Sequence, residues 1–170
     1  MEELDKARFR TVVNNMFIQL FNAISKGKLD DVLHFLKEQP KEYVEEIINN
    51  LKKNNYIQHY DEMNINDLNM KLIFEDSEKL IYGAAVTIDS LNYITDKNGE
   101  IVSGYDDCRV KKTYFIKIIK NIKTRENDII RRCPGCRHSL DSNYSGKCPY
   151  CGAIFNQEDY DYQLLEIKEA

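Results

Sequence analysis

The 170-residue sequence contains no tryptophan, no long apolar run and no strong excess of charge of either sign. A membrane-spanning helix, which needs about 20 mostly apolar residues, is therefore not expected. The charged, amphipathic start of the chain lacks the apolar core and the small-residue cleavage site of a secretory signal. The net charge of −4 gives no general reason to expect a nucleic acid or an anionic membrane as partner. We expect a cytoplasmic protein, soluble or peripherally membrane-associated.

The chain has enough apolar material for one ordinary domain with a small addition. Hydrophobic residues make up 42% of the sequence, which can build a packed core. The 11 tyrosines are typical of half-buried strands, because each ring has an apolar body and a polar tip. No internal repeat and no low-complexity tract is present.

The first third of the chain shows helical periodicity. Apolar residues recur every three or four positions from residue 4 to 26, and Gly27 then marks a helix end. A shorter second helix is predicted over residues 29–37. Pro40 suits the start of a third helix, which should end at Asn54-Asn55.

After about residue 56 the apolar period changes to two, which indicates strands. Strands are predicted over 66–74, 80–94, 109–122 and 160–167. The sequence Asp96–Gly99 ends in Asn-Gly and predicts a tight hairpin turn, after which Ile101 and Val102 begin the returning strand. Helices followed by strands are the order of an α+β domain.

Four of the five cysteines form two Cys-Pro-x-Cys pairs separated by eleven residues. Cys133 and Cys136 make the first pair, and Cys148 and Cys151 make the second. Four thiolates at this spacing can close a tetrahedron around Zn²⁺. A four-thiolate site has no open position for substrate, so the predicted zinc is structural. An iron–sulfur centre, which also uses four thiolates, is the alternative.

The cysteine segment divides the chain. Residues 131–155 carry few apolar side chains and are predicted to be a zinc-ribbon insertion. Residues 1–130 and 156–170 would then form the main α+β domain, with the last strand following the ribbon. The fifth cysteine, Cys108, shares a strand parity with Val110 and is expected to be a buried small hydrophobe.

Basic residues gather between residues 109 and 137, where ten of them face only two acidic ones. This could be the electrostatic footprint of a nucleic-acid-binding zinc ribbon. We favour a solvated strand face, since lysines there alternate with apolar residues. The residues of this candidate basic patch are Arg109, Lys111, Lys112, Lys117, Arg131 and Arg132.

Evidence for catalysis is slight. His59 and Asp61 are spaced so that both lie on one side of an extended strand, as an acid–base pair could. No nucleophile elbow, phosphate loop or open metal motif accompanies them. We therefore expect no enzyme; a small enzyme that uses this pair is the alternative.

Two segments resemble the Tim44-like domain family. Asn14–Leu36 is similar to the helices that open the domain, and Val86–Gly104 is similar to its strand–turn–strand hairpin. The residues that carry the resemblance are Met16, Phe17, Gln19, Ala23, Gly27, Asp30 and Leu33, then Gly99, Glu100, Ile101, Val102 and Gly104. Some bacterial members also place a cysteine ribbon before a final strand. The family often has tryptophan where this chain has Phe21 and Tyr114.

The resemblance implies an NTF2/cystatin-like fold, in which N-terminal helices pack on a curved antiparallel sheet around an apolar pocket. It implies a binding or scaffold role at protein or membrane surfaces. A protein partner or self-association is the favoured form of binding, with a lipid contact or a nucleic acid as alternatives. The candidate pocket-wall residues are Tyr82, Val86, Ile88, Tyr93, Tyr114 and Ile116.

Overall fold

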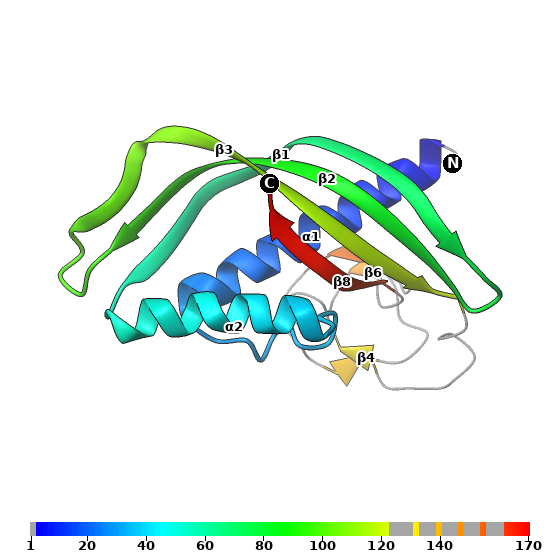
Figure 1. The fold of residues 1–170 in the computed structure, drawn as a ribbon, viewed down its shortest axis with the longest axis horizontal. Helices are drawn as coiled ribbons and strands as arrows, with labels where there is room; N and C mark the ends of the chain where they lie inside the picture. The colour runs from blue at the N-terminus through cyan, green and yellow to red at the C-terminus, as the bar shows by residue number, and fades with distance from the viewer. Residues whose placement is uncertain (1–2, 123–130, 133–138, 141–145, 148–153, 156–161) are drawn as a thin grey trace.

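The computed structural model describes residues 3–122, 131–132, 139–140, 146–147, 154–155 and 162–170. These residues form two helices, one four-stranded sheet and two small two-stranded ladders, which confirms the α+β class (Figure 1). The main elements are α1 (Glu3–Lys26), α2 (Glu38–Lys53), β1 (Ile57–Glu75), β2 (Lys79–Thr95), β3 (Ile101–Asn121) and β8 (Tyr162–Glu169). The ladders consist of β4 (Arg131–Arg132), β5 (Ser139–Leu140), β6 (Gly146–Lys147) and β7 (Ile154–Phe155).

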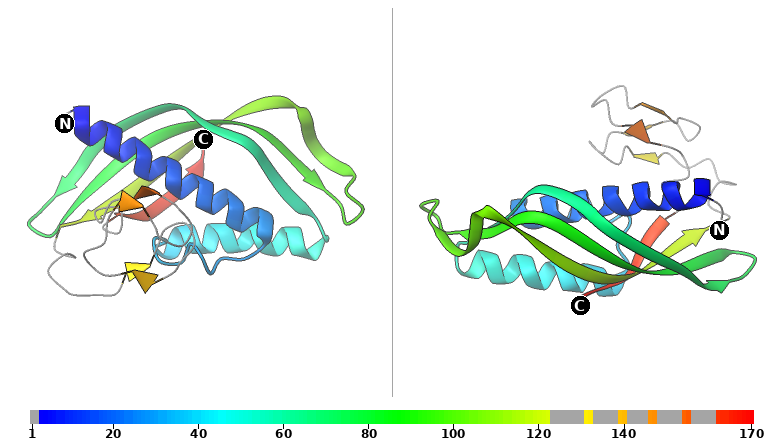
Figure 2. Two further views of the ribbon diagram at one scale, coloured as in Figure 1. Left: turned by 180° about the vertical axis from the view of Figure 1, so that it is seen from behind. Right: turned by 90° about the horizontal axis from the view of Figure 1, so that it is seen from above.

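The sheet has the order β1-β2-β3-β8, and all its neighbouring strands are antiparallel. It arches over the two helices (Figure 1). Seen from above, α1 and α2 run along opposite sides of the arch (Figure 2). Helix α1 packs mainly against β1, and α2 mainly against β8, so each helix lies toward one edge of the sheet.

Both helices bury one apolar stripe. In α1 the side chains of Phe9, Val13 and Phe17 are almost fully buried, as the period of 3.6 residues predicts. The helix ends before Gly27, whose φ of +71° suits glycine. In α2, Pro40 lies in the first turn, where its missing N–H costs nothing. The predicted bounds of these two helices are therefore confirmed to within a few residues.

The predicted helix over residues 29–37 is wrong. This segment forms two short turns instead. The N–H of Val32 donates to the Leu29 carbonyl at 3.0 Å, and the N–H of Phe35 donates to the Val32 carbonyl at 3.2 Å. The segment then runs beside the last strand. Leu164 of β8 donates to the carbonyl oxygen of Phe35 at 2.7 Å and accepts from the N–H of Lys37 at 2.9 Å. The backbone groups of Phe35 and Lys37 thus form hydrogen bonds with the edge of β8 instead of bonds within a helix.

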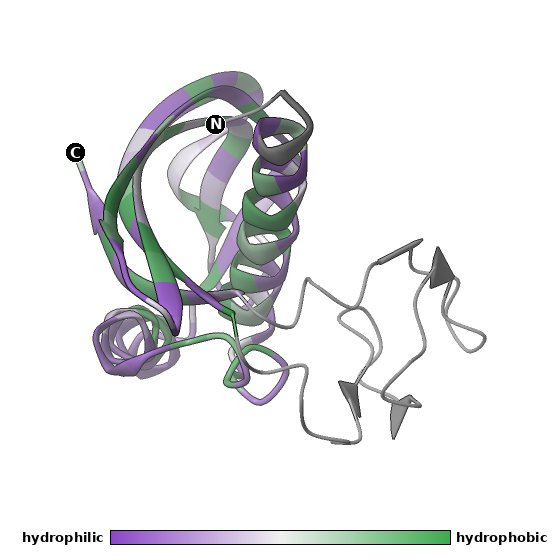
Figure 3. Cartoon of the chain, turned by 90° about the vertical axis from the view of Figure 1, so that its right-hand side faces the viewer, coloured by the Kyte–Doolittle hydropathy of each residue, from purple (hydrophilic) through white to green (hydrophobic). Residues whose placement is uncertain are grey.

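The strands are longer than their alternation predicts. β1 begins at Ile57 rather than residue 66. β3 begins at Ile101, as predicted for the return from the hairpin, and continues without a break into the strand predicted from residue 109. The first half of β3 lies beyond the core, whereas the first half of β1 contributes Tyr60 and Ile65 to the core without a regular apolar alternation. Both halves pair with β2 along most of their length. Figure 3 shows hydrophobic and hydrophilic positions alternating along the strands of the arch. The even-numbered positions of β2 from Tyr82 to Ile88 form the inner face, against α1.

Cys108 corrects another prediction, because its side chain is exposed. β8 pairs with β3 only from Tyr114 to Lys120, so the first half of β3 extends past the core. In the ladder with β2, Tyr93 pairs with Gly104 and Leu91 pairs with Arg109, which leaves the residues around Cys108 in a bulge. Strand parity therefore does not predict burial there.

No helix in the described part of the chain combines the length and apolar character that a membrane crossing requires.

Candidate functional site

The predicted pocket-wall residues fall into two groups. Five of them lie buried on the inner face of the sheet: Tyr82, Val86, Ile88, Tyr114 and Ile116. Aromatic side chains of α1 fill the space against them. The ring centroids of Phe9 and Tyr82 are 5.2 Å apart, and those of Phe17 and Tyr114 are 5.4 Å apart. Much of this predicted wall is therefore packed against α1.

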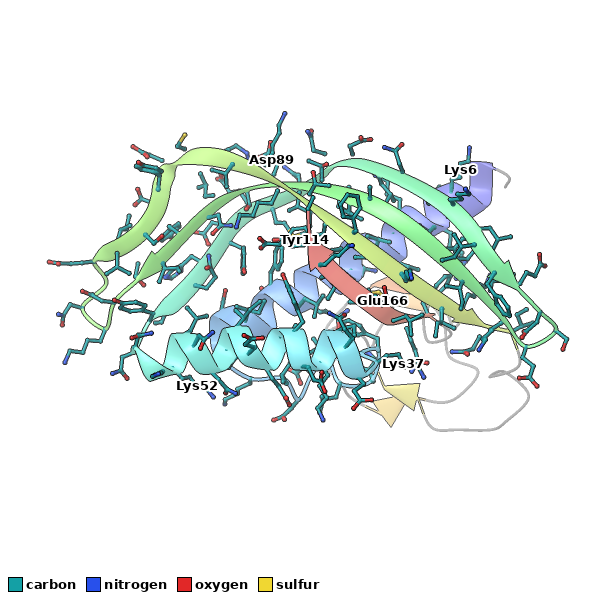
Figure 4. The ribbon with its side chains drawn as sticks, in the orientation of Figure 1. Lys6, Lys37, Lys52, Asp89, Tyr114 and Glu166 are labelled. Atoms are coloured by element: carbon teal, nitrogen blue, oxygen red, sulfur yellow. The ribbon has the colours of Figure 1, made fainter. Side chains whose placement is uncertain are left out.

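Next to this packed region, three tyrosines from three elements come together with a carboxylate. Tyr43 comes from α2, Tyr60 from β1 and Tyr114 from β3, and Glu169 of β8 lies within electrostatic range of all three. We call these four residues the phenol cluster. The ring of Tyr60 stacks on that of Phe21 in α1, with centroids 3.9 Å apart and planes 14° apart. Tyr114 lies on the central part of the arch (Figure 4).

The phenols of this cluster are held in the neutral form. Burial is the main cause, and it raises the pKa of Tyr60 and Tyr114 well above the ordinary value of 10. Burial, helped by the negative charge of Glu169, raises the pKa of Tyr43 to about 12. A neutral phenol can donate and accept hydrogen bonds, but it does not serve as a general base near neutral pH. The three phenols therefore stay protonated near neutral pH.

Sequence reasoning identified only Tyr114 of this cluster as a site residue. Tyr43 belongs to the apolar stripe of α2, and Tyr60 lies in the half of β1 that the alternation did not detect. Both positions look like ordinary core in the sequence. The pairing of the strands and the placement of α2 bring them together.

The sixth predicted wall residue, Tyr93, lies apart from the others. It occupies an odd position of β2 and pairs with His59 of β1. The two rings are stacked, with centroids 4.6 Å apart. The Tyr93 hydroxyl donates to Asp61 at 2.6 Å, and this hydrogen bond raises the pKa of Tyr93 to about 12. His59 Nε2 lies 2.8 Å from the Thr95 hydroxyl. The histidine and the carboxylate considered for catalysis thus both bond to cross-strand neighbours.

Ion pairs neutralise much of the candidate basic patch. Arg109 forms ion pairs with Asp89 and with Glu62, the second at 3.2 Å, and it also donates to the Glu62 carbonyl at 2.6 Å. Asp89 lies at the crest of the arch (Figure 4). Lys112 and Lys117 pair with carboxylates of β8 at 3.7 and 3.3 Å.

The remaining predicted basic residues are Lys111, Arg131 and Arg132. Lys111 is exposed on β3. Arg131 and Arg132 form β4, and their side chains lie outside the described residues.

The four predicted zinc ligands, Cys133, Cys136, Cys148 and Cys151, lie outside the described residues. The ladders around them in the sequence are described. β4 pairs with β5 on either side of the first cysteine pair, and β6 pairs with β7 on either side of the second. Among the described residues, no group of three or more His, Cys, Asp or Glu side chains could hold a metal ion. The zinc site therefore stays a prediction.

Comparison with known proteins gives one family match. The family model of the Tim44-like domain matches residues 2–128. This range contains α1, α2 and the three long strands, and it stops before the first cysteine pair. No curated protein matches the chain significantly.

Proposed function

The chain belongs to the Tim44-like domain family, and from this membership we propose that it is a non-enzymatic binding module that holds a partner at a protein or membrane surface. The family match carries this proposal. The phenol cluster supports it, because Tyr43, Tyr60 and Tyr114 offer neutral hydrogen-bonding groups in apolar surroundings. A segment of a partner protein is the occupant we favour, with self-association and a peripheral lipid contact as weaker candidates.

We also propose that the cysteine segment binds one structural Zn²⁺. Two Cys-Pro-x-Cys pairs supply four thiolates, and a short antiparallel ladder brackets each pair in the sequence. Structural zinc contributes about 10–16 kcal/mol of apparent binding free energy in small peptides, enough to order a segment with almost no core of its own. The ribbon over 131–155 would be an insertion before β8 in an NTF2/cystatin-like domain, and it would add a second contact surface.

Two other functions have less support. A nucleic-acid interface needs free cations, whereas Arg109, Lys112 and Lys117 are paired with carboxylates. An enzyme needs an acid–base group that reaches a substrate, whereas His59 and Asp61 are bonded to Thr95 and Tyr93.

The proposal is tested by affinity capture from the native cell, with the 170-residue chain as bait. A double variant, Tyr43→Phe with Tyr60→Phe, removes two hydroxyl groups and keeps both rings. We expect it to fold and to capture the wild-type partner several-fold less, since each lost hydrogen bond to a partner costs about 1 kcal/mol. Tyr105→Phe is the matched control, because Tyr105 is 66% exposed in the outlying half of β3.

Two outcomes would oppose the binding role. Equal capture by wild type and double variant would show that the partner does not use the phenol cluster. Robust turnover of a substrate, abolished by His59→Ala, would replace the binding function with an enzymatic one.

A further inference from the structure

A groove of about 500 Å³ lies on the outer face of the sheet, the face opposite α1. Gly83 and Ala85 of the central strand β2 form its floor. Ile73 of β1 and Phe115 of β3 form its apolar walls, and they are 47% and 44% exposed. Gln39 at the start of α2 closes one side. The phenol cluster belongs to the inner side of the sheet, so the two sites are separate.

The floor is open because a side chain is missing there, and the backbone does not require glycine. Gly83 does not have a positive φ. A Cβ added to it would meet only methyl carbons of Ile73, at 3.7 and 3.8 Å, which is ordinary contact. Glycine within a strand weakens the strand and often marks a place where a ligand approaches the backbone closely. A larger residue at position 83 would fill the groove without straining the sheet.

The rim of the groove is positively charged. Lys71, Lys117 and Lys168 line it, with Glu166 as the one acidic lining residue among those described. Lys117 pairs with Glu166 at 3.3 Å, as the placement of Glu166 on β8 allows (Figure 4). In the described part of the chain, Lys71 and Lys168 form no ion pair. The ammonium of Lys168 lies 5.8 Å from the ring centroid of Phe115, directly beside the apolar wall.

We propose that this groove binds a single-chain amphipathic carboxylate, such as a free fatty acid. The alkyl chain would lie over Gly83 and Ala85 between Ile73 and Phe115, and the carboxylate would meet the lysine rim. The volume falls within the range of roughly 300–1,000 Å³ typical of small-molecule sites. This inference is independent of the proposed binding of a partner on the inner side.

The chemistry of the floor favours an alkyl chain over a peptide. The backbone N–H and carbonyl groups of β2 along the floor are used in ladders with β1 and β3 on both sides. A peptide laid on this face would lose water from its own backbone groups without finding new partners, which costs free energy. An alkyl chain has no such groups, and the long lysine side chains can reach a carboxylate at the rim.

The test is calorimetric titration of the full chain with monomeric dodecanoate. Wild type should bind it, and dodecyltrimethylammonium, with the same chain and opposite charge, should bind much more weakly. Gly83→Val should weaken dodecanoate binding about tenfold or more, because its side chain takes the place of one or two methylenes. The dodecanoate affinity of Gly83→Ala should lie between those of wild type and Gly83→Val. Both variants should unfold no more easily than wild type.

Charge variants test the rim. Lys71→Glu should weaken dodecanoate binding several-fold, and Glu166→Gln should strengthen it by freeing Lys117. Lys111→Glu is the matched control, since it makes the same charge change on β3 four residues from Phe115. That separation is about 13 Å along the strand, beyond the screening length of about 8 Å at physiological salt. Its affinity should equal that of wild type.

Four results would overturn the proposal. They are absence of dodecanoate binding to wild type, equal binding of the cationic amphiphile, and equal affinity in Gly83→Val. The fourth is a wild-type dimer in light scattering that Gly83→Val converts to a monomer, because the groove would then be an interface between two copies. Binding to anionic phospholipid vesicles without binding to free dodecanoate would likewise replace the free ligand with a membrane surface.

Discussion

The side chain of Gln39 pairs with the backbone of Ile167 as a neighbouring strand would. Its Nε2 donates to the Ile167 carbonyl at 3.0 Å, and its Oε1 accepts from the Ile167 N–H at 2.9 Å. Three residues earlier in β8, Leu164 makes two backbone hydrogen bonds with the segment before α2. The outer edge of β8 is therefore covered, which removes a site where another chain could add a strand. The same bonds fix the start of α2 to the sheet.

Gln39→Met should destabilise the fold by about 1–3 kcal/mol, because it removes two hydrogen bonds of about 0.5–1.5 kcal/mol each and keeps the length of the side chain. Gln39→Glu should cost more, since a carboxylate oxygen would then face the Ile167 carbonyl. Urea denaturation measures the change. Lys41→Met, at an exposed position of the same helix, is the control and should change stability little. Equal stability of the Gln39→Met variant and wild type would mean that this pairing does not hold α2 in place.

Two glycines with similar backbone angles should respond differently to alanine. Gly104 has a φ of +79°, and a Cβ there would lie 2.3 Å from the Asn92 carbonyl oxygen. Gly99 has a φ of +84° and nothing within 4 Å of the same position. Gly99→Ala should cost about 1–2 kcal/mol, from the left-handed backbone alone. Gly104→Ala should cost at least about 2 kcal/mol more, because the backbone of β2 must move. Thermal and urea unfolding of the two variants compare them; equal losses would contradict the close approach.

The sequence predicts those parts of the fold that depend on local periodicity. Helix α1 and the core half of β2 bury side chains in one stripe or on one face, so their spacing reveals them. The segment 29–37 has the same kind of spacing but bonds to β8, more than 120 residues away, through Leu164. No local pattern contains that information. Cys108 shows the same limit, because its exposure depends on where β8 ends.

The candidate site could be predicted only in part for a related reason. Tyr114 stands out because it alternates with other apolar residues in a long strand. The raised pKa of Tyr43 comes from burial and the charge of Glu169, and that of Tyr60 from burial, Tyr43 and Glu169, all of which the tertiary fold brings together. The groove over Gly83 was also missed, since a glycine in a strand has many structural explanations.

Cys148→Ser should release the proposed zinc ion. The loss of one thiolate from a four-thiolate site leaves an incomplete tetrahedron, and the affinity should fall by several orders of magnitude. Elemental analysis of purified protein measures the stoichiometry, with one zinc per chain expected for wild type and for Cys108→Ser. The near-ultraviolet spectrum of the buried tyrosines should be largely retained, since α1 and the inner face of the sheet form their own core. Wild-type protein without stoichiometric metal would contradict the zinc proposal.

The candidate basic patch should give no salt-sensitive binding to DNA or RNA. Arg109, Lys112 and Lys117 are already paired with carboxylates, so few condensed counterions would be released. Fluorescence anisotropy with labelled single- and double-stranded oligonucleotides, at about 50 and 200 mM salt, measures this. A protein with six or more phosphate contacts loses about 10³-fold or more in affinity over that range. A loss of affinity of that size would support nucleic-acid binding as the function in place of the proposed one.

The phenol cluster should make the fold sensitive to alkaline pH. Burial raises the folded-state pKa of Tyr43 from 10 to about 12, and it raises those of Tyr60 and Tyr114 as well. In the unfolded chain all three phenols ionise near pH 10. Below that value both states hold the proton and stability does not depend on these groups. Between about pH 10 and 12 only the unfolded state loses it, so the free energy of unfolding should fall as pH rises. Urea denaturation in that window measures the slope.

The triple variant Tyr43→Phe, Tyr60→Phe, Tyr114→Phe keeps the rings without the ionisable groups, and its stability should fall less steeply than that of wild type. Parallel slopes would mean that the cluster is not held neutral by the fold, which would remove the physical basis for assigning it to binding.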